Sequence, residues 1–130
     1  MNKKSTERAI LEAHKNPNGW VYDIDYLYKK DDRIPSEAIL GAWEVDESGN
    51  LTSIYKVNEN YRPVIEKEKV LPQYMHSVAK FCQNQWIAEV KREYENLFPR
   101  YPDDAILGYW YVDQDGTITK KFRPTKYFIE

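Results

Sequence analysis

The residue types most able to perform catalysis are scarce in this sequence. It contains a single cysteine, Cys82, and two histidines, His14 and His76. On a helix of 3.6 residues per turn, the six-residue spacing from His76 to Cys82 places the two side chains on different sides of the axis. Cys82 also falls on an apolar stripe, so we interpret it as an inert buried thiol. Neither histidine has the spacing of metal ligands, and we predict no catalytic residue, no metal site and no cofactor.

Carboxylates are more frequent and often occur in pairs. They include Asp23, Asp25, Glu44, Asp103 and Asp104. General acid–base catalysis by such a pair would need a pocket and shifted pKa values, and the sequence shows neither. Residues Asp113–Ile118 resemble the middle of a calcium-binding loop, but Tyr111 and Phe122 stand at two essential ligand positions. A hairpin turn explains this segment. The remaining carboxylates are either solvated or form an acidic surface that attracts a basic partner.

The eleven tyrosines are concentrated near the predicted strands. Tyr109 and Tyr111 alternate away from Trp110, and therefore face the other side of the sheet. Tyrosine beside carboxylates favours protein binding, because its ring gives a large contact area at low entropic cost. The alternative is that the tyrosines are simply good strand formers. The predicted partner-binding residues are Tyr109, Tyr111, Glu44, Asp23, Asp25, Asp103 and Asp104.

An internal duplication is the strongest pattern in the chain. Residues 34–52 and 101–119 align at a shift of 67 positions with ten identities in nineteen. The identities are Pro35/Pro102, Ala38/Ala105, Ile39/Ile106, Leu40/Leu107, Gly41/Gly108, Trp43/Trp110, Val45/Val112, Asp46/Asp113, Gly49/Gly116 and Thr52/Thr119. Chance would give about one identity at ordinary residue frequencies. We therefore predict two copies of one β-hairpin, spanning residues 34–57 and 101–123.

Alternation within each copy predicts the side that faces the core. Four positions share one face of each first strand: Ile39, Gly41, Trp43 and Val45 in one copy, and Ile106, Gly108, Trp110 and Val112 in the other. We expect this face to line the core. Both strands end in an Asp-x-x-Gly sequence, from Asp46 to Gly49 and from Asp113 to Gly116. This sequence is typical of a type I turn followed by a glycine with positive φ.

Periodicity predicts the other elements. We expect a short helix over residues 5–15 with Ser5 as its N-cap, and a strand over residues 20–26 with alternating side chains. Apolar residues at every third or fourth position predict one long helix over residues 73–97. In the alternative, residues 86–90 form a strand, because they resemble residues 20–24 at a shift of 66. The Glu, Lys, Arg and Ala content of residues 88–97 favours the helix.

Length and composition limit the class of protein. The 130 residues fit a single domain, and an aromatic content of 15% indicates a packed core rather than disorder. The net charge of −2, without a basic excess, argues against nucleic-acid binding. A lone cysteine fits a reducing compartment. No apolar segment is long enough for a signal peptide or a membrane span, so we expect a cytoplasmic protein without membrane partners.

One resemblance bears on function. The segment Asn16–Tyr22, followed by the pattern of Pro, Ala, Ile, Gly, Trp, Val, Asp and Gly from Pro35 to Gly49, resembles short bacterial conserved proteins of unassigned activity. Some of these are grouped with immunity proteins of polymorphic toxin systems. The resemblance covers mainly residues 7–63 and carries no functional residues onto this chain. It implies a cytoplasmic inhibitor that binds one cognate toxin and has no turnover.

Together these patterns predict an α+β fold. We expect an antiparallel sheet of about five strands, with a short N-terminal helix and a long central helix packed mainly on one face. The leading function is a non-catalytic protein-binding module, whose partner would be a basic toxin domain. The alternative is a small-ligand-binding or enzymatic domain with a pocket between sheet and helices, lined by Trp20, Trp43, Trp86 and Trp110. A third alternative is a homodimer that pairs through exposed strand edges.

Overall fold

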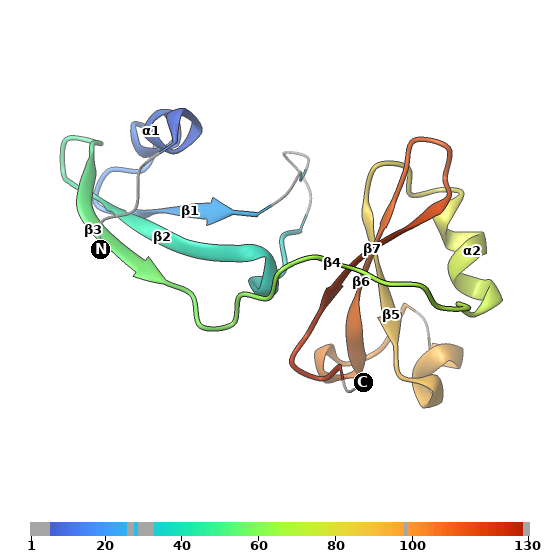
Figure 1. Cartoon of the computed structure of the whole chain (residues 1–130). Coiled ribbons are helices and arrows are strands. Elements are labelled where there is room, and N and C mark those ends of the chain that lie inside the picture. Colours follow the sequence, from blue (N-terminus) through green and yellow to red (C-terminus); the bar gives the residue numbers. More distant parts are fainter. Residues whose placement is uncertain (1–5, 26–27, 29–32, 98, 129–130) are drawn as a thin grey trace. The chain divides into compact units, whose positions relative to one another are not determined.

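The chain forms two compact units, Met1–Tyr61 and Arg62–Glu130. Figure 1 shows the computed structural model, which describes residues 6–25, 28, 33–97 and 99–128. Each unit combines a short helix with an antiparallel sheet, so the predicted α+β class is confirmed. The single sheet of about five strands is wrong, because the described residues form separate sheets of three and four strands. Each copy of the hairpin builds a sheet with its own additional strands.

The described residues of unit 1, residues 1–61, form a three-stranded sheet and one helix. Its elements are α1 (Glu7–Ala13), β1 (Trp20–Ile24), the 3-10 turn η1 (Ser36–Ala38), β2 (Ile39–Val45) and β3 (Leu51–Val57), and the strand order is β1-β2-β3. The short N-terminal helix is present. Thr6 is its N-cap, and the Thr6 side chain accepts a hydrogen bond from the Ala9 N–H at 3.1 Å. The predicted cap Ser5 and the predicted strand end Tyr26 lie outside the described residues.

Unit 2, residues 62–130, contains the same succession of elements with two additions. It consists of β4 (Ile65–Glu66), α2 (Gln73–Ala79), β5 (Trp86–Val90), η2 (Arg92–Leu97), η3 (Asp103–Ala105), β6 (Ile106–Val112) and β7 (Ile118–Pro124). The strand order is β4-β7-β6-β5. Helix, strand, 3-10 turn and hairpin follow one another as in unit 1, and β4 and η2 are the additions.

The predicted long helix over residues 73–97 is wrong. The helix α2 ends at Ala79 with Lys80 as C-cap, and Asn84 then adopts a left-handed conformation with φ of 59°. A left-handed residue interrupts helical hydrogen bonding. The chain continues as β5, whose Ile87 lies opposite Trp110 of β6. Pairing with the hairpin therefore decides the structure of residues 86–90, in favour of the strand alternative.

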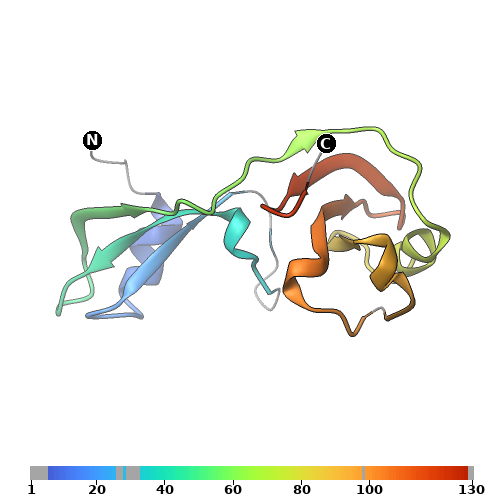
Figure 2. The same cartoon turned by 90° about the horizontal axis from the view of Figure 1, so that it is seen from below.

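Each unit has a hydrophobic core built from its own residues. In unit 1 the buried cluster joins α1 to the sheet through Ala9, Ala13, Val21, Trp43 and Val45. In unit 2 it joins α2 to the sheet through Leu71, Met75, Ala79, Ile87, Trp110, Val112 and Phe122. Figures 1 and 2 show each helix against its sheet. The predicted core face is confirmed at Trp43, Val45, Trp110 and Val112, which belong to these clusters. It is wrong for Ile39, which is only partly buried and lines a groove instead.

The two hairpin turns have the predicted geometry. Gly49 and Gly116 have φ values of 80° and 77°. One carboxylate oxygen of Asp46 accepts hydrogen bonds from the N–H groups of Ser48 and Asn50, both at 2.9 Å. The second turn repeats this arrangement around Asp113. An aspartate that binds its own turn backbone fixes the loop, which accounts for the calcium-loop resemblance of the second copy.

Candidate functional site

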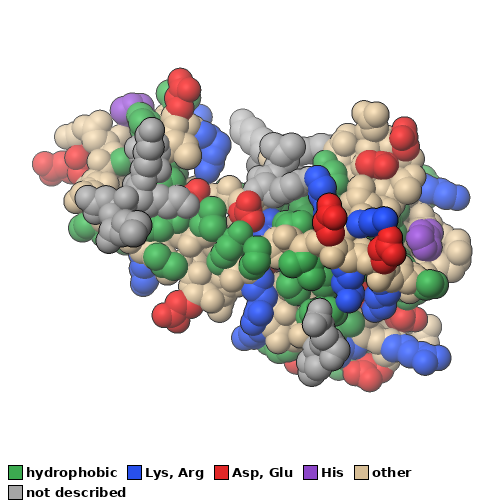
Figure 3. Space-filling model, viewed as in Figure 1, with side chains coloured by type: hydrophobic (Ala, Val, Ile, Leu, Met, Phe, Trp, Pro, Cys, Tyr) green, Lys and Arg blue, Asp and Glu red, His purple; other side chains and the backbone are tan. Residues whose placement is uncertain are grey.

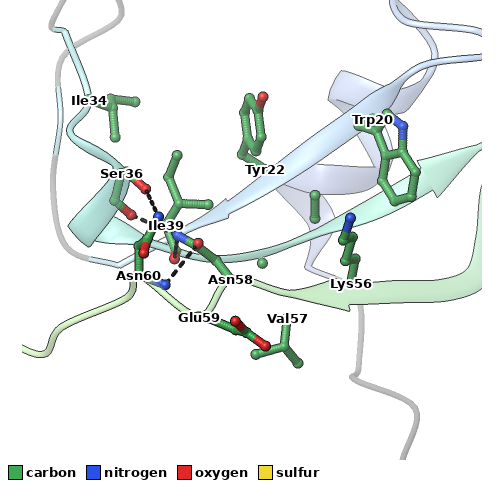
Figure 4. A pocket seen from close by; sticks show the side chains of 12 residues that line it. Trp20, Tyr22, Ile34, Ser36, Ile39, Lys56, Val57, Asn58, Glu59 and Asn60 are labelled. Carbon is green, nitrogen blue, oxygen red and sulfur yellow. Dashed lines mark hydrogen bonds between the residues drawn. The ribbon is translucent and has the colours of Figure 1, made fainter.

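Unit 1 contains a shallow groove whose lining includes exposed aromatic side chains. It has a volume of about 900 Å³ and is lined by residues of all three strands and of the loops at one end of the sheet. Its lining includes Trp20, Tyr22, Ile39, Ala42, Lys56 and Asn58. In the sheet register, Tyr22 lies opposite Ala42, and Ala42 lies opposite Lys56. These neighbours form a row across the sheet, and Figure 4 shows Tyr22 and Lys56 on it.

The groove contains two large aromatic side chains that the core does not use. Val21 points into the core of unit 1, so its neighbours Trp20 and Tyr22 point to the opposite face of the sheet. Trp20 is 46% exposed and Tyr22 is 56% exposed. Both rings lie on the same side of the ribbon in Figure 4. The small side chain of Ala42 leaves space beside Tyr22. The two rings therefore form an apolar patch within the groove, and each ring is about half exposed to solvent.

One end of the groove is held by an asparagine network. The side-chain amide of Asn58 donates hydrogen bonds to the carbonyl oxygens of Ser36 and Ile39, both at 2.8 Å. The Asn58 backbone N–H donates to the Leu40 carbonyl at 3.0 Å, and its side-chain oxygen accepts from the Asn60 N–H at 3.1 Å. Figure 4 shows part of this network. Such anchoring lowers the entropy lost when a ligand binds, so this end of the groove is preorganised.

Two of the predicted partner-binding carboxylates accept hydrogen bonds from tyrosine hydroxyls within unit 1. Asp23 is only 7% exposed and accepts a hydrogen bond from the Tyr55 hydroxyl at 2.8 Å. Burial raises the pKa of Tyr55, and the hydrogen bond to Asp23 and the negative charge there raise it further. Asp25 accepts a hydrogen bond from the Tyr61 hydroxyl at 2.6 Å. Both carboxylates therefore position tyrosines.

The other predicted partner-binding residues are distributed over both units. Glu44 lies on β2 of unit 1, whereas Tyr109 and Tyr111 lie on β6 of unit 2. All three are partly buried. Tyr111 packs edge-on against Trp86, with 5.2 Å between the ring centroids. The exposed Asp103 and Asp104 belong to η3. On the face shown in Figure 3, acidic and basic side chains are interspersed over unit 2 rather than separated by sign.

The four tryptophans have different environments. Trp43 and Trp110 are core residues of unit 1 and unit 2 respectively. Trp20 lines the groove of unit 1, and Trp86 of unit 2 contacts Tyr111 and lies 5.4 Å from the guanidinium carbon of Arg123. Trp20 is thus the member of the predicted tryptophan set that lines this groove.

The cysteine and the histidines do not form a reactive group among the described residues. The sequence predicts Cys82 to be buried on a helix, but it follows the end of α2 and is only partly buried against the core of unit 2. His76 on α2 and His14 after α1 are both exposed. Within the same described part of the chain, no three His, Cys, Asp or Glu side chains are close enough together to hold a metal ion.

Sequence reasoning identified Trp20 but missed Tyr22, Lys56 and Asn58 as groove residues. The alternation of residues 20–24 indicates two faces, but Val21 and Asp23 on one side and two aromatics on the other do not reveal which is buried. The Asn58-Glu59-Asn60 sequence was a usable signal, because asparagine side chains often organise loops.

Comparisons with protein-family models, curated proteins and solved structures give no match for this chain. In the described part of the chain, every helix is too short or too polar to cross a membrane.

Proposed function

We propose that this protein is a non-catalytic protein-binding module that uses the groove of unit 1. The observation that carries the proposal is the adjacent pair of half-exposed aromatics, Trp20 and Tyr22, on a sheet face with a preorganised end. Trp and Tyr dominate the energetically important positions of protein interfaces. An exposed apolar surface of this kind is typical of an interaction site.

The polar rim of the groove supports the same function. Lys56 and Glu59 provide charges of both signs, and Asn60 provides an amide. A protein interface typically combines a central apolar anchor with a polar rim. In this arrangement Trp20 and Tyr22 anchor the partner, while the rim residues fix its orientation.

Toxin neutralisation is the form of this function that we favour. It is supported by the resemblance of residues 7–63 to immunity-like bacterial proteins, because the groove lies within that range. An immunity protein needs a tight binding surface and no turnover. The partner would then be one cognate toxin domain, encoded next to this protein in the source genome.

The test is an affinity capture with matched variants. Immobilised wild-type protein should retain one stoichiometric partner from its source cell, and the variant Trp20→Ala/Tyr22→Ala should lose it. Loss of one hot-spot side chain weakens binding by at least about 2 kcal/mol, or roughly 30-fold. The control Leu11→Ala removes an exposed apolar side chain of α1 outside the groove and should retain the partner.

Circular dichroism must show that the double variant remains folded, which we expect because both side chains are half exposed. The proposal fails if the double variant retains the partner as well as the wild type does. It also fails if the wild type captures nothing at low or high salt.

A small ligand is the second candidate for the same groove. Its volume of about 900 Å³ lies within the range of roughly 300–1,000 Å³ for small-molecule sites. Binding would raise the melting temperature by mass action and change Trp20 fluorescence. A metabolite panel measured on wild type and Trp20→Phe separates this candidate from the first, since a protein-binding groove should respond to none of the compounds.

A further inference from the structure

The two units differ in how they cover one edge of the sheet. In unit 2 the outer edge of β7 is paired with β4, so that Ile65 lies opposite Phe122 and Glu66 opposite Lys121. The Lys67 N–H donates to the Lys120 carbonyl at 2.8 Å. Figure 2 shows β4 running along this edge. In unit 1 the corresponding strand β3 is the last strand of its sheet, and no described residue pairs with its outer side.

The side chains of the two edges also differ, and the edge of β3 carries the more apolar ones. At the shift of 67 positions, Lys121 and Pro124 on the covered edge correspond to Ile54 and Val57 on the open edge. Ile54 is 53% exposed and Val57 is 68% exposed. Lysine and proline are residues with which proteins protect strand edges from pairing, whereas exposed Ile and Val favour pairing. The exposed Ile54 and Val57 therefore favour pairing at the outer edge of β3, and β7 shows that an edge with lysine and proline can also pair.

The backbone of the open edge is suited to pairing. The Ile54 N–H donates a hydrogen bond to the Thr52 hydroxyl oxygen at 3.1 Å. The equivalent Lys121 N–H donates to the Thr119 hydroxyl oxygen at 3.2 Å, and β7 still pairs with β4. This local hydrogen bond is thus compatible with an added strand. By the same correspondence, the Ser53 carbonyl occupies the outward position of the Lys120 carbonyl.

We propose that β3 pairs antiparallel with β3 of a second copy of this chain. The edge is self-complementary, because Lys56 is the single charged residue of β3. A two-fold axis near Ile54 and Tyr55 places Lys56 opposite Thr52 or Ile54 and never opposite its own copy. The exposed Ile54 side chains come together at the axis. Favourable cross-strand neighbours without like charges stabilise such a pair.

The dimer would have a consequence for the groove. A two-fold axis between antiparallel strands is perpendicular to the sheet, so that the same face of both copies points in the same direction. Two sheets of three strands would become one continuous sheet with both grooves on one face. A dimer of this form offers two identical sites to a partner. The pairing itself does not depend on the proposed function of the groove.

The test is the oligomeric state of the full chain. Light scattering and sedimentation from about 1 to 100 µM, the range of moderate protein affinities, should give twice the chain mass of 15.5 kDa. The variant Ile54→Lys places two ammonium groups at the axis and should weaken the dimer at least tenfold. The control Phe81→Lys, at a side chain that is 85% exposed in unit 2, should leave it unchanged.

Hydrogen exchange locates the interface and shows that the variants are folded. Amides of Leu51–Val57 should exchange more slowly as the protein concentration rises, and Ile54→Lys should abolish this dependence. A monomer whose β3 edge binds a peptide of residues 63–69 but no second copy would overturn the proposal. A wild-type protein that is monomeric at every concentration would overturn it too. So would a dimer that Ile54→Lys leaves intact, or one without added protection at β3.

Discussion

Asp23 and Glu89 occupy equivalent positions of the two units, and the glutamate side chain is longer by one methylene group. Asp23 of β1 and Glu89 of β5 are both buried, with 7% and 4% of their surfaces exposed. The longer Glu89 accepts a hydrogen bond from the Trp110 indole at 3.1 Å and also forms an ion pair with Lys69. Asp23 binds the Tyr55 hydroxyl, and the Trp43 indole N–H finds no acceptor among the described residues. Phe122 stands at the position of Tyr55 in unit 2 and has no hydroxyl, and Glu89 there accepts from the Trp110 indole instead.

The hydrogen bond from Tyr55 to Asp23 should contribute measurably to stability. We expect Tyr55→Phe to lower the free energy of unfolding by about 1–3 kcal/mol, because it removes a donor from a buried carboxylate. Urea unfolding followed by circular dichroism measures this change. The matched control Tyr22→Phe affects a half-exposed ring of the same sheet and should change stability by less than about 0.5 kcal/mol. Equal effects for the two variants would contradict the prediction.

The same bond predicts a loss of stability in alkali. The pKa of Tyr55 is raised in the folded protein above its ordinary value of 10.0, first by burial and then by Asp23. The folded state therefore holds this proton more tightly than the unfolded state does. Its contribution is fully present below pH 10 and is lost as the pH rises further. Burial raises the pKa of Tyr74 and Tyr101 in the same direction.

Unfolding free energies between pH 7 and pH 11 test this alkaline effect. The free energy should fall above pH 10, and Tyr55→Phe should reduce the slope without abolishing it. Absorbance at 295 nm reports phenolate formation directly. Titration of all the tyrosines near pH 10 in protein that is still folded would be inconsistent with the predicted shift.

At the level of elements, a glycine in each central strand allows an aromatic ring to cross the backbone. A Cβ at Gly41 would lie 2.5 Å from the Tyr55 ring, and a Cβ at Gly108 would lie 2.2 Å from the Phe122 ring. These rings in turn contact Trp43 and Trp110, with centroid distances of 5.0 and 4.7 Å. The absence of a side chain at Gly41 and Gly108 thus lets these rings pack against the core tryptophans.

We expect Gly108→Ala to lower stability by about 1–3 kcal/mol, because it overpacks a site that has no space for a methyl group. The double variant Gly108→Ala/Phe122→Ala should be less destabilised than the sum of the two single variants, since removing the ring relieves much of the clash. Chemical denaturation of all four proteins measures this coupling. Simple additivity would show that the ring does not limit the space.

At the level of the whole molecule, each unit has the core of a small domain. The buried cluster of unit 2 includes Trp110, Phe122, Met75 and Leu71, whereas two of the five buried members in unit 1 are alanines. Larger apolar side chains contribute more to folding, and chains of about 60 residues are marginal on their own. Unit 2 should therefore be the more stable of the two.

This difference predicts the behaviour of the separated units. The fragment of residues 62–130 should unfold cooperatively with a well-defined near-ultraviolet signal from Trp86 and Trp110. The fragment of residues 1–61 should be less stable in the same urea titration. A fragment 62–130 without a cooperative transition, or one less stable than residues 1–61, would contradict the prediction.

The sequence by itself determined the local features that repeat. The hairpins, their Asp-x-x-Gly turns and the buried face with Trp43 and Trp110 all follow from side-chain alternation and turn chemistry, which depend on neighbouring residues. The short N-terminal helix followed in the same way, since the breaker cluster at residues 16–19 ends it. At residues 83–85 no proline or glycine marks the corresponding break, so the apolar stripe there predicts a longer helix.

Tertiary structure decided the features that depend on distant partners. Residues 86–90 became a strand because β6 offers a pairing edge. The side of β1 that faces the core depends on where α1 packs, and this choice left Trp20 and Tyr22 in a groove and buried Asp23. Among the described residues, β4 pairs with the outer edge of β7 in unit 2, and no strand pairs with the outer edge of β3 in unit 1. Each outcome depends on contacts between residues far apart in the chain, which local periodicity does not encode.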